Sequence, residues 1–249
     1  MASSRRPMVS ALAVGAVLLA AVSLIVATLL LDNQTSDQSD AAEMPSATLP
    51  SVNMDPVYAF LGDSYTAGAK AGGLSKSFPR DVCRAKTARC VINGQDGTGF
   101  ISTGNTLDGV SAYGDRILKL SDRGNGDKPS LIVVQGGLSD PGTAAVRTAA
   151  SRVFAALKTA YPNARVLVVG PVQPRAFDPA VVTANRIAMR AAAADAGLRF
   201  LDPIGERWIQ DRAMFDADGK HLTASGYQVF ADQIVLAINQ VLSTPGASG

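Results

Sequence analysis

The stretch VYAFLGDSYTAG, residues 57–68, is the part of the sequence around which the rest of the chain is interpreted. Its first five residues are apolar and of types that favour β-strands, and they run directly into Gly62, Asp63 and Ser64. Because small and polar residues follow, we expect a buried strand that ends at a turn, with a helix starting just after it. Ligands of open α/β folds gather at the carboxyl ends of the strands, and the free N–H groups of a helix start attract negative charge. Ser64 is therefore either a nucleophile or the cap of that helix.

The N-terminal part of the chain carries much of its apolar excess. The 249 residues are 47% hydrophobic and 18% charged, and Arg5 and Arg6 precede an unbroken run of apolar or small residues from 8 to 31. At 1.5 Å per helical residue, such a run spans the roughly 30 Å hydrocarbon core of a bilayer. It is longer than the apolar region of most signal peptides and runs straight into Asp32, so we predict an uncleaved anchor. A cleaved signal peptide, including one of the twin-arginine type, is the alternative.

The predicted anchor indicates where the rest of the chain is located and how it is divided into segments. Arginines before the span place the N-terminus in the cytoplasm and the remainder outside, either tethered at the cell membrane or secreted after cleavage. Residues 32–54 are rich in Ser, Thr, Ala, Asp and Pro without an aromatic residue, which is typical of a disordered linker. We expect a catalytic domain over residues 55–243 and a disordered tail over 244–249.

Two features of composition narrow the class of the exported domain. Cys83 and Cys90 are the only cysteines, and an oxidising compartment favours a local disulfide between them over two free thiols. A metal site would need more ligands than these two, so no metal or cofactor is expected. The net charge is +2 and no basic cluster stands out, which gives no case for nucleic-acid binding.

The order of predicted elements in the exported part indicates an α/β domain. Five short β-type runs occur at residues 57–61, 90–93, 131–135, 165–170 and 198–202. Helical spacing of apolar residues occupies 143–161, 181–196 and 225–242 between or after them. Strands that alternate with helices predict a parallel sheet covered by helices on both faces.

His221 is the only histidine, and it stands in a loop between the last predicted strand and the last helix. Asp218 precedes it by three residues. In a turn, this spacing allows the carboxylate to reach the imidazole Nδ1–H, fix the tautomer and stabilise the imidazolium. Together with Ser64, the pair would supply a nucleophile, a base and an orienting acid, although an incidental surface histidine is the plain alternative.

Two glycine-rich segments follow the second and third predicted strands, at residues 93–100 and 136–142. Glycines there let backbone N–H groups approach a ligand closely, as an oxyanion hole requires, and ordinary turn formation would also explain them. With Gly62-Asp63-Ser64 and Asp218-x-x-His221, the order of these motifs over residues 56–242 resembles the SGNH hydrolases, also called the GDSL lipase and esterase family.

The resemblance implies a fold and a set of roles. The fold is a three-layer α/β/α sandwich with a mostly parallel, flavodoxin-like five-stranded sheet. Ser64 would be the nucleophile, His221 the general base and acid, and Asp218 its orienting partner. The backbone N–H groups of Ser64 and Gly97, in preference to Gly99, would donate to the oxyanion.

Position 139 departs from the family pattern. The third family donor is an asparagine in Gly-x-Asn-Asp, and Ser139 stands at that position. A shorter side chain there predicts a weakened oxyanion hole, since losing one such donor costs about 10² to 10³ in turnover in a well-studied protease. Ser139 also suggests a rival, because residues 137–141 begin like the Gly-x-Ser-x-Gly elbow of α/β-hydrolases, with Asp202 and His221 in the right order. Pro141 in place of the second glycine argues against that elbow.

The sequence therefore predicts a membrane-tethered serine esterase that faces the exterior and hydrolyses carboxylic esters through an acyl-serine intermediate. Its partners would be the membrane and small-molecule, glycan or lipid esters of the cell envelope. An O-acyltransferase that uses the same site is one alternative. A binding protein with weakened catalysis is another.

Overall fold

The computed structural model describes residues 55–121, 124 and 126–243. The predicted membrane span at 8–31, the predicted linker at 32–54 and the predicted tail at 244–249 lie outside these residues. Within the described part, no helix has both the length and the apolar character needed to cross a bilayer.

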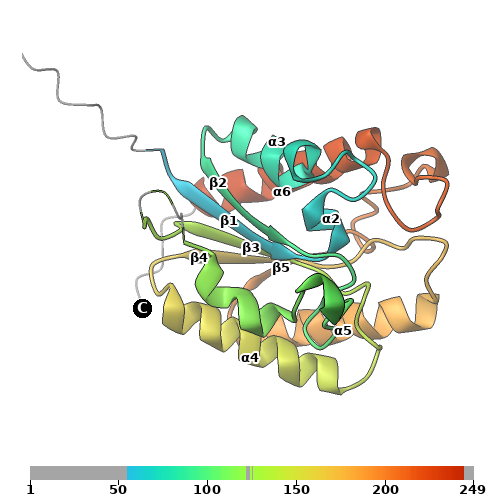
Figure 1. Ribbon diagram of the computed structural model, residues 1–249, viewed down its shortest axis with the longest axis horizontal. Coiled ribbons are helices and arrows are strands. Elements are labelled where there is room, and N and C mark those ends of the chain that lie inside the picture. Colours follow the sequence, from blue (N-terminus) through green and yellow to red (C-terminus); the bar gives the residue numbers. More distant parts are fainter. Residues whose placement is uncertain (1–54, 122–123, 125, 244–249) are drawn as a thin grey trace, which may run out of the picture. The chain divides into compact units, whose positions relative to one another are not determined.

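A single five-stranded sheet forms the middle layer (Figure 1). Its strands are β1 (Val57–Gly62), β2 (Arg89–Gly94), β3 (Leu131–Gln135), β4 (Arg165–Val169) and β5 (Arg199–Leu201). They lie in the order β2-β1-β3-β4-β5, and each neighbouring pair is parallel. The sheet predicted to be mostly parallel is thus parallel throughout.

Helices cover both faces of the sheet. The α-helices are α2 (Ser64–Ala67), α3 (Phe78–Ala85), α4 (Ala145–Ala160), α5 (Pro179–Asp195) and α6 (Ala224–Ser243). Short 3-10 helices are η1 (Leu74–Lys76), η2 (Thr106–Asp108), η3 (Tyr113–Lys119) and η4 (Arg212–Met214). Helices α3 and α6 lie on one face of the sheet and α4 and α5 on the other (Figure 1). The fold is therefore a three-layer α/β/α sandwich, as expected.

The alternation of side chains along β1 explains why both faces are covered. Tyr58 and Phe60 point into the core with α3 and α6, whereas Ala59 and Leu61 point into the core with α4 and α5. All four are buried, so β1 is an apolar strand at the centre of the domain.

The strand order creates a switch point at the carboxyl end of β1. From β1 the chain crosses to β2 on one side and then returns to β3 on the other. In open parallel sheets a crevice forms where the strand order reverses in this way, and ligands bind there. Ser64 follows β1 and Ser139 follows β3, so both serines lie beyond the carboxyl ends of neighbouring strands at this switch point.

A disulfide joins Cys83 in α3 to Cys90 in β2, with an S–S distance of 2.14 Å. It closes a loop of sequence separation 7. Both cysteines belong to or pack against the core on the α3 and α6 side. The bond therefore ties the edge strand β2 to the helix that precedes it.

Candidate active site

Ser64 is the first residue of α2, immediately after β1. Asp63 is the N-cap, because its carboxylate accepts the backbone N–H of Tyr65 at 2.9 Å. The hypothesis that Ser64 merely caps the helix is therefore wrong. Gly62 permits this sharp turn, since a Cβ there would lie 2.0 Å from Thr66 Oγ1 and 2.9 Å from the Gln135 carbonyl oxygen.

The backbone N–H and the hydroxyl of Ser64 form no hydrogen bond within the described part of the chain. Its backbone N–H is one of the free donors of a helix start and meets no acceptor there, and its hydroxyl has no hydrogen-bond partner there. The residue is 8% exposed. Both groups thus remain available to a ligand that enters from the crevice.

Asp218 and His221 form the turn that the sequence predicted. The Asp218 Oδ2 atom lies 2.7 Å from His221 Nδ1, and Oδ1 accepts the backbone N–H groups of Lys220 and His221 at 2.8 and 3.0 Å. Burial alone would raise the pKa of the Asp218 carboxyl, but these hydrogen bonds and the charge of His221 hold that pKa well below its ordinary value. The carboxylate therefore stays ionised and fixes the imidazole with Nε2 free.

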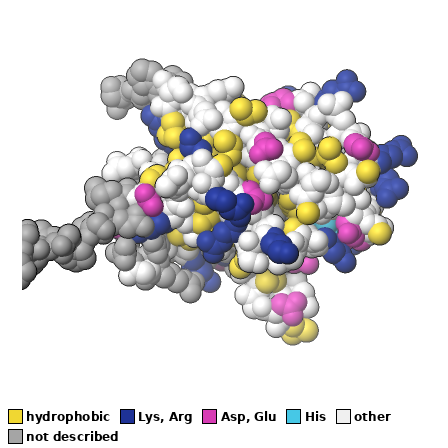
Figure 2. Space-filling model, turned by 90° about the horizontal axis from the view of Figure 1, so that it is seen from above, with side chains coloured by type: hydrophobic (Ala, Val, Ile, Leu, Met, Phe, Trp, Pro, Cys, Tyr) yellow, Lys and Arg dark blue, Asp and Glu magenta, His cyan; other side chains and the backbone are white. Residues whose placement is uncertain are grey.

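The His221 turn is docked against the helix that carries Ser64. The Tyr65 hydroxyl donates to the Lys220 carbonyl at 2.6 Å, and the Tyr65 and His221 rings lie 6.0 Å apart between centroids. Tyr65 is buried, which makes it a packing residue and not part of a substrate groove. The side chain of His221 is 15% exposed, and histidine appears as a cyan patch on the surface in Figure 2.

The His221 turn contacts helix α2 through Tyr65, the residue after Ser64. Among the described residues no hydrogen bond connects the Ser64 hydroxyl to His221. Such bonds are often long before a substrate closes the site, so this geometry is compatible with His221 as the base for Ser64.

The two glycines considered as oxyanion donors differ in their hydrogen bonds. The Gly99 N–H donates to the Ser102 carbonyl at 2.8 Å. The Gly97 N–H meets no acceptor in the part of the chain described, and Gly97 has a φ of 68° that favours glycine. This difference supports the choice of Gly97.

Ser139 is half-buried at the end of β3, and its hydroxyl has no partner among the described residues. Its carbonyl accepts the Ser102 hydroxyl at 2.6 Å. The side chain is therefore free to donate, although it is shorter than the asparagine of the family pattern.

Asp140 is a site residue whose role sequence reasoning missed. Its buried carboxylate accepts three consecutive backbone N–H groups, from Phe100 at 3.0 Å, Ile101 at 2.8 Å and Ser102 at 3.2 Å. Asn185 of α5 in turn donates to the Asp140 carbonyl at 2.7 Å. Asp140 therefore locks the loop that carries Gly97 to the loop that carries Ser139. The acid was visible in the motif, but its three partners lie about 40 residues away in sequence.

Arg116 is fully buried and links the ends of two strands. It donates to the carbonyls of Asn93 at 2.9 Å and Gly62 at 3.1 Å, and to Thr98 Oγ1 at 2.9 Å. Burial lowers the pKa of its guanidinium. Arg116 thus fixes the residue next to Gly97 relative to the turn before Ser64.

Asp63 is a buried acid directly beneath the serine. Its Oδ2 atom lies 3.4 Å from the Gln135 amide nitrogen, and the residue is 0% exposed. Burial raises the pKa of its carboxyl to about 7, although the hydrogen bonds from Tyr65 and Gln135 act in the opposite direction. The helix cap therefore changes its charge near neutral pH.

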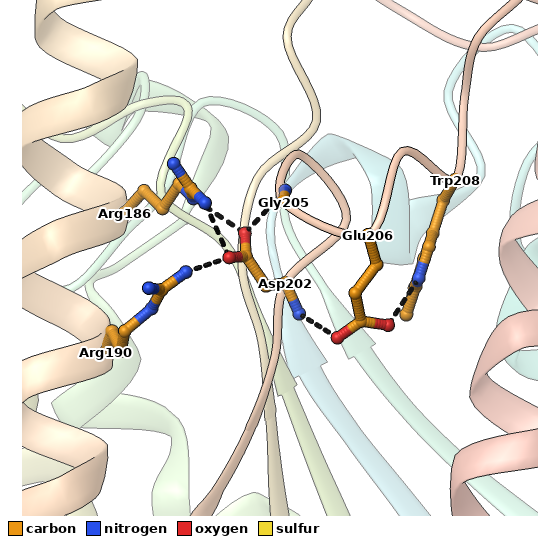
Figure 3. A network of polar contacts seen from close by, with 6 residues as sticks. All are labelled: Arg186, Arg190, Asp202, Gly205, Glu206 and Trp208. Carbon is orange, nitrogen blue, oxygen red and sulfur yellow. Dashed lines mark hydrogen bonds and ion pairs between the residues drawn. The ribbon is translucent and has the colours of Figure 1, made fainter.

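The rival arrangement with Asp202 as the acid is wrong. Figure 3 shows the Asp202 carboxylate held by Arg186 and Arg190 and by the Gly205 N–H. The two Arg186 contacts are both 2.6 Å. His221 already has Asp218 on Nδ1, and Asp202 instead holds the chain where it leaves β5.

The described residues hold no group of three His, Cys, Asp or Glu side chains arranged as metal ligands. The two cysteines are bonded to each other, and the histidine is bonded to an aspartate.

The class of protein follows from this fold and this arrangement. A parallel three-layer sandwich with a serine after β1, a glycine loop after β2 and Asp-x-x-His before the last helix is the plan of the SGNH-type hydrolases. Residues 60–229 match the family model described as GDSL-like Lipase/Acylhydrolase family. The chain belongs to that family, and it is an ester hydrolase of this type.

Relatives with known sequences or structures agree with the assignment. The chain is 31% identical over 197 residues to the GDSL lipase Rv0518 of Mycobacterium tuberculosis (strain ATCC 25618 / H37Rv), a match that covers 76% of this chain and 84% of that protein. The fold resembles a lipase/acylhydrolase from Enterococcus faecalis, with a TM-score of 0.59, 18% identity, and coverage of 77% of this chain and 100% of the other. It also resembles a carbohydrate acetylesterase family member from Sinorhizobium meliloti, with a TM-score of 0.60, 18% identity, and coverage of 76% and 100%.

Proposed function

We propose that this protein is a serine esterase that forms an acyl-enzyme on Ser64 and is tethered outside the cell membrane by its N-terminal segment. The observation that carries the proposal is the Asp218–His221 turn docked onto helix α2. Its Asp218 Oδ2 to His221 Nδ1 distance is 2.7 Å, and the Tyr65 hydroxyl bonds to the Lys220 carbonyl. An oriented base on a turn docked against the helix of Ser64 supports this role, as does a serine whose hydroxyl and N–H have no partner among the described residues.

The first half of the reaction acylates the serine. His221 Nε2 takes the proton of the Ser64 hydroxyl as the oxygen attacks the ester carbonyl carbon. The carbonyl oxygen becomes an oxyanion, to which the N–H groups of Ser64 and Gly97 and the hydroxyl of Ser139 donate. The C–O bond to the alcohol then breaks, and His221 returns the proton to the departing alkoxide.

The second half releases the acid. Water gives a proton to His221 Nε2 and attacks the acyl carbon, a second oxyanion forms in the same place, and the Ser64 oxygen leaves with the proton. Throughout, the ionised Asp218 stabilises the imidazolium without accepting its proton. Every group that reacts in these steps belongs to the chain, to the ester or to water.

Substrates in the cell envelope fit the proposed location. A catalytic domain held beside the membrane meets acylated glycans and lipids, and the Sinorhizobium meliloti structure of the same fold is titled a carbohydrate acetylesterase family member. A retained serine, base and acid supports catalysis over a purely binding role.

A series of p-nitrophenyl esters from acetyl to long acyl chains tests the proposal on the purified full-length protein. We expect hydrolysis by the wild type and loss of at least 10³-fold in kcat for Ser64→Ala, in line with the cost of removing a triad nucleophile. Ser225→Ala is a matched control, since Ser225 is exposed and, among the described residues, its hydroxyl forms a hydrogen bond with Thr223 alone. Equal hydrolysis by the wild type and Ser64→Ala would refute the role of Ser64.

A glycan acceptor added to the same assay separates hydrolysis from acyl transfer. Free acid is the product expected of an esterase. Acylated acceptor in place of free acid would show that the acyl-enzyme reacts with sugar hydroxyls.

A further inference from the structure

A pair of adjoining hollows lies beside the catalytic turn, and we call them the arginine groove. The first has a volume of about 320 Å³ and the second about 330 Å³. They share the lining residues Gln173, Ile209 and Gln210, so the two hollows adjoin each other. The first is also lined by Arg175 and Arg212, and the second by Arg207.

The groove is joined directly to the turn that carries His221. The Ala176 N–H donates to the Gly219 carbonyl at 3.0 Å, and a Cβ at Gly219 would lie 3.9 Å from Arg175 Cβ. Phe215, which also lines the first hollow, pairs with Leu222 in an antiparallel bridge. Two of the segments that line the first hollow are therefore in contact with residues 219–222. The first hollow therefore adjoins the turn that carries His221.

The charges on the groove walls are of one sign. Neither hollow has an aspartate or glutamate among its described lining residues. Arg175, Arg207 and Arg212 are exposed, and none of them forms an ion pair within the part of the chain that the structure describes.

Acidic residues do occur near the groove, but their carboxylates accept hydrogen bonds from backbone N–H groups. Asp178 caps α5 by accepting the Ala180 N–H at 2.8 Å, and Asp211 caps η4 by accepting the Ala213 N–H at 2.9 Å. Asp216 accepts the Asp218 N–H at 3.3 Å. These carboxylates moderate the field around the groove without neutralising any one arginine through an ion pair.

The wall that carries Arg207 is held in place by the network in Figure 3. Asp202 receives Arg186 and Arg190 and the Gly205 N–H, while Glu206 accepts the Trp208 indole N–H at 2.9 Å. Trp208 is buried against Phe230 and is a packing residue. The groove wall is thus fixed before any ligand arrives, which lowers the entropy cost of binding.

We propose that the arginine groove binds an anionic group, a carboxylate or phosphate, on the same molecule whose ester reacts at Ser64. Guanidinium groups match both anions in geometry, and the side-chain amide of Gln210 suits the hydroxyls of a sugar. The preferred substrates are then acylated acidic glycans. This inference rests on the proposed function, because it assigns the substrate class of the same site.

Acetate release from three acetylated oligosaccharides tests this preference on the full-length protein. Two of the substrates are an acetylated oligogalacturonate and its neutral methyl-esterified form. The third is an acetylated oligosaccharide that carries a phosphate group. We expect a higher kcat/KM for the charged substrates, and we expect Arg175→Gln and Arg212→Gln each to lower the charged-to-neutral ratio about tenfold. Arg152→Gln removes one exposed charge from α4, away from the groove, and the ratio should stay as in the wild type. The substrate whose kcat/KM falls more in these variants, the galacturonate or the sugar phosphate, shows whether the groove prefers a carboxylate or a phosphate.

Binding to the Ser64→Ala protein supplies a readout that does not depend on turnover. Calorimetry with unacetylated oligogalacturonate and with a sugar phosphate should show binding that weakens about tenfold when Arg175→Gln is added, and that weakens with added salt. The proposal that the groove binds an anion would be overturned if neither anion bound. It would also be overturned if the affinity were the same with and without Arg175→Gln. The proposed function would still stand if wild-type hydrolysis of neutral esters were lost in Ser64→Ala. Hydrolysis that survives in Ser64→Ala would instead refute the proposed function, while the calorimetry still decides the groove.

Discussion

Replacing Asp140 by asparagine tests how the site is held together. The carboxylate accepts the N–H groups of Phe100, Ile101 and Ser102 at 3.0, 2.8 and 3.2 Å. An amide keeps one acceptor oxygen, so one buried N–H loses its acceptor and faces an NH₂ group. The remaining bonds change from charged to neutral acceptors.

The size of the effect follows from these three bonds. A hydrogen bond to a charged group contributes about 1.5–3 kcal/mol and a neutral one about 0.5–1.5 kcal/mol, and leaving a buried donor unpaired costs about 1–3 kcal/mol. We therefore expect Asp140→Asn to lower the free energy of unfolding by about 2–4 kcal/mol. Turnover should fall by about 10-fold to 10²-fold, because the Gly97 and Ser139 loops lose their common anchor.

Urea unfolding followed by the emission of Trp208 measures the stability change. Trp208 is the single tryptophan of the chain and is 7% exposed. Asp195→Asn is the matched control, since Asp195 is more than half exposed in its pair with Arg147 and should change stability by less than about 1 kcal/mol. If Asp140→Asn behaved like Asp195→Asn in both unfolding and turnover, Asp140 would not be the anchor of the site.

Three further predictions concern the charges and donors of the site. Asp218→Asn should lower kcat by roughly 10³- to 10⁴-fold at unchanged fold, because the His221 tautomer is lost; kinetics together with circular dichroism check this, and a loss under tenfold would count against the pairing. Because burial raises the pKa of Asp63 to about 7, its contribution to stability is fully present below about pH 4 and is lost as pH rises through 7. Asp63→Asn should then show a smaller fall in urea midpoint between pH 5 and pH 8 than the wild type, and equal falls would contradict the assignment. Ser139→Asn restores the family donor and should raise kcat for p-nitrophenyl esters at unchanged fold, whereas an unchanged or lower rate would exclude Ser139 as a weakened donor.

Much of the fold was predictable because the apolar pattern of each strand is short and continuous. The run at 57–61 became β1, the run at 131–135 became β3, and the helix predicted at 225–242 became α6 (Ala224–Ser243). Strand ends moved by at most one residue and helix ends by one or two, since sequence pattern does not specify where the last backbone hydrogen bond of an element is lost. The pairing of Asp218 with His221 was predictable for a related reason, because both lie in one local turn.

Contacts between distant segments were not predictable in the same way. Arg116 reads as an ordinary surface arginine in sequence, and only the fold brings it beneath the carboxyl ends of β1 and β2. Asp202 stands at the position along the chain that the rival α/β-hydrolase triad would require. The arginines that form ion pairs with it lie on the neighbouring helix α5. Such roles depend on which elements become neighbours in space.

The site of covalent labelling tests the central claim most directly. The full-length protein is treated with a fluorophosphonate and digested, and the modified peptide is sequenced by mass spectrometry. The account predicts one adduct, on Ser64, that disappears in Ser64→Ala and persists in Ser139→Ala. An adduct on Ser139, or labelling that survives in Ser64→Ala, would contradict it.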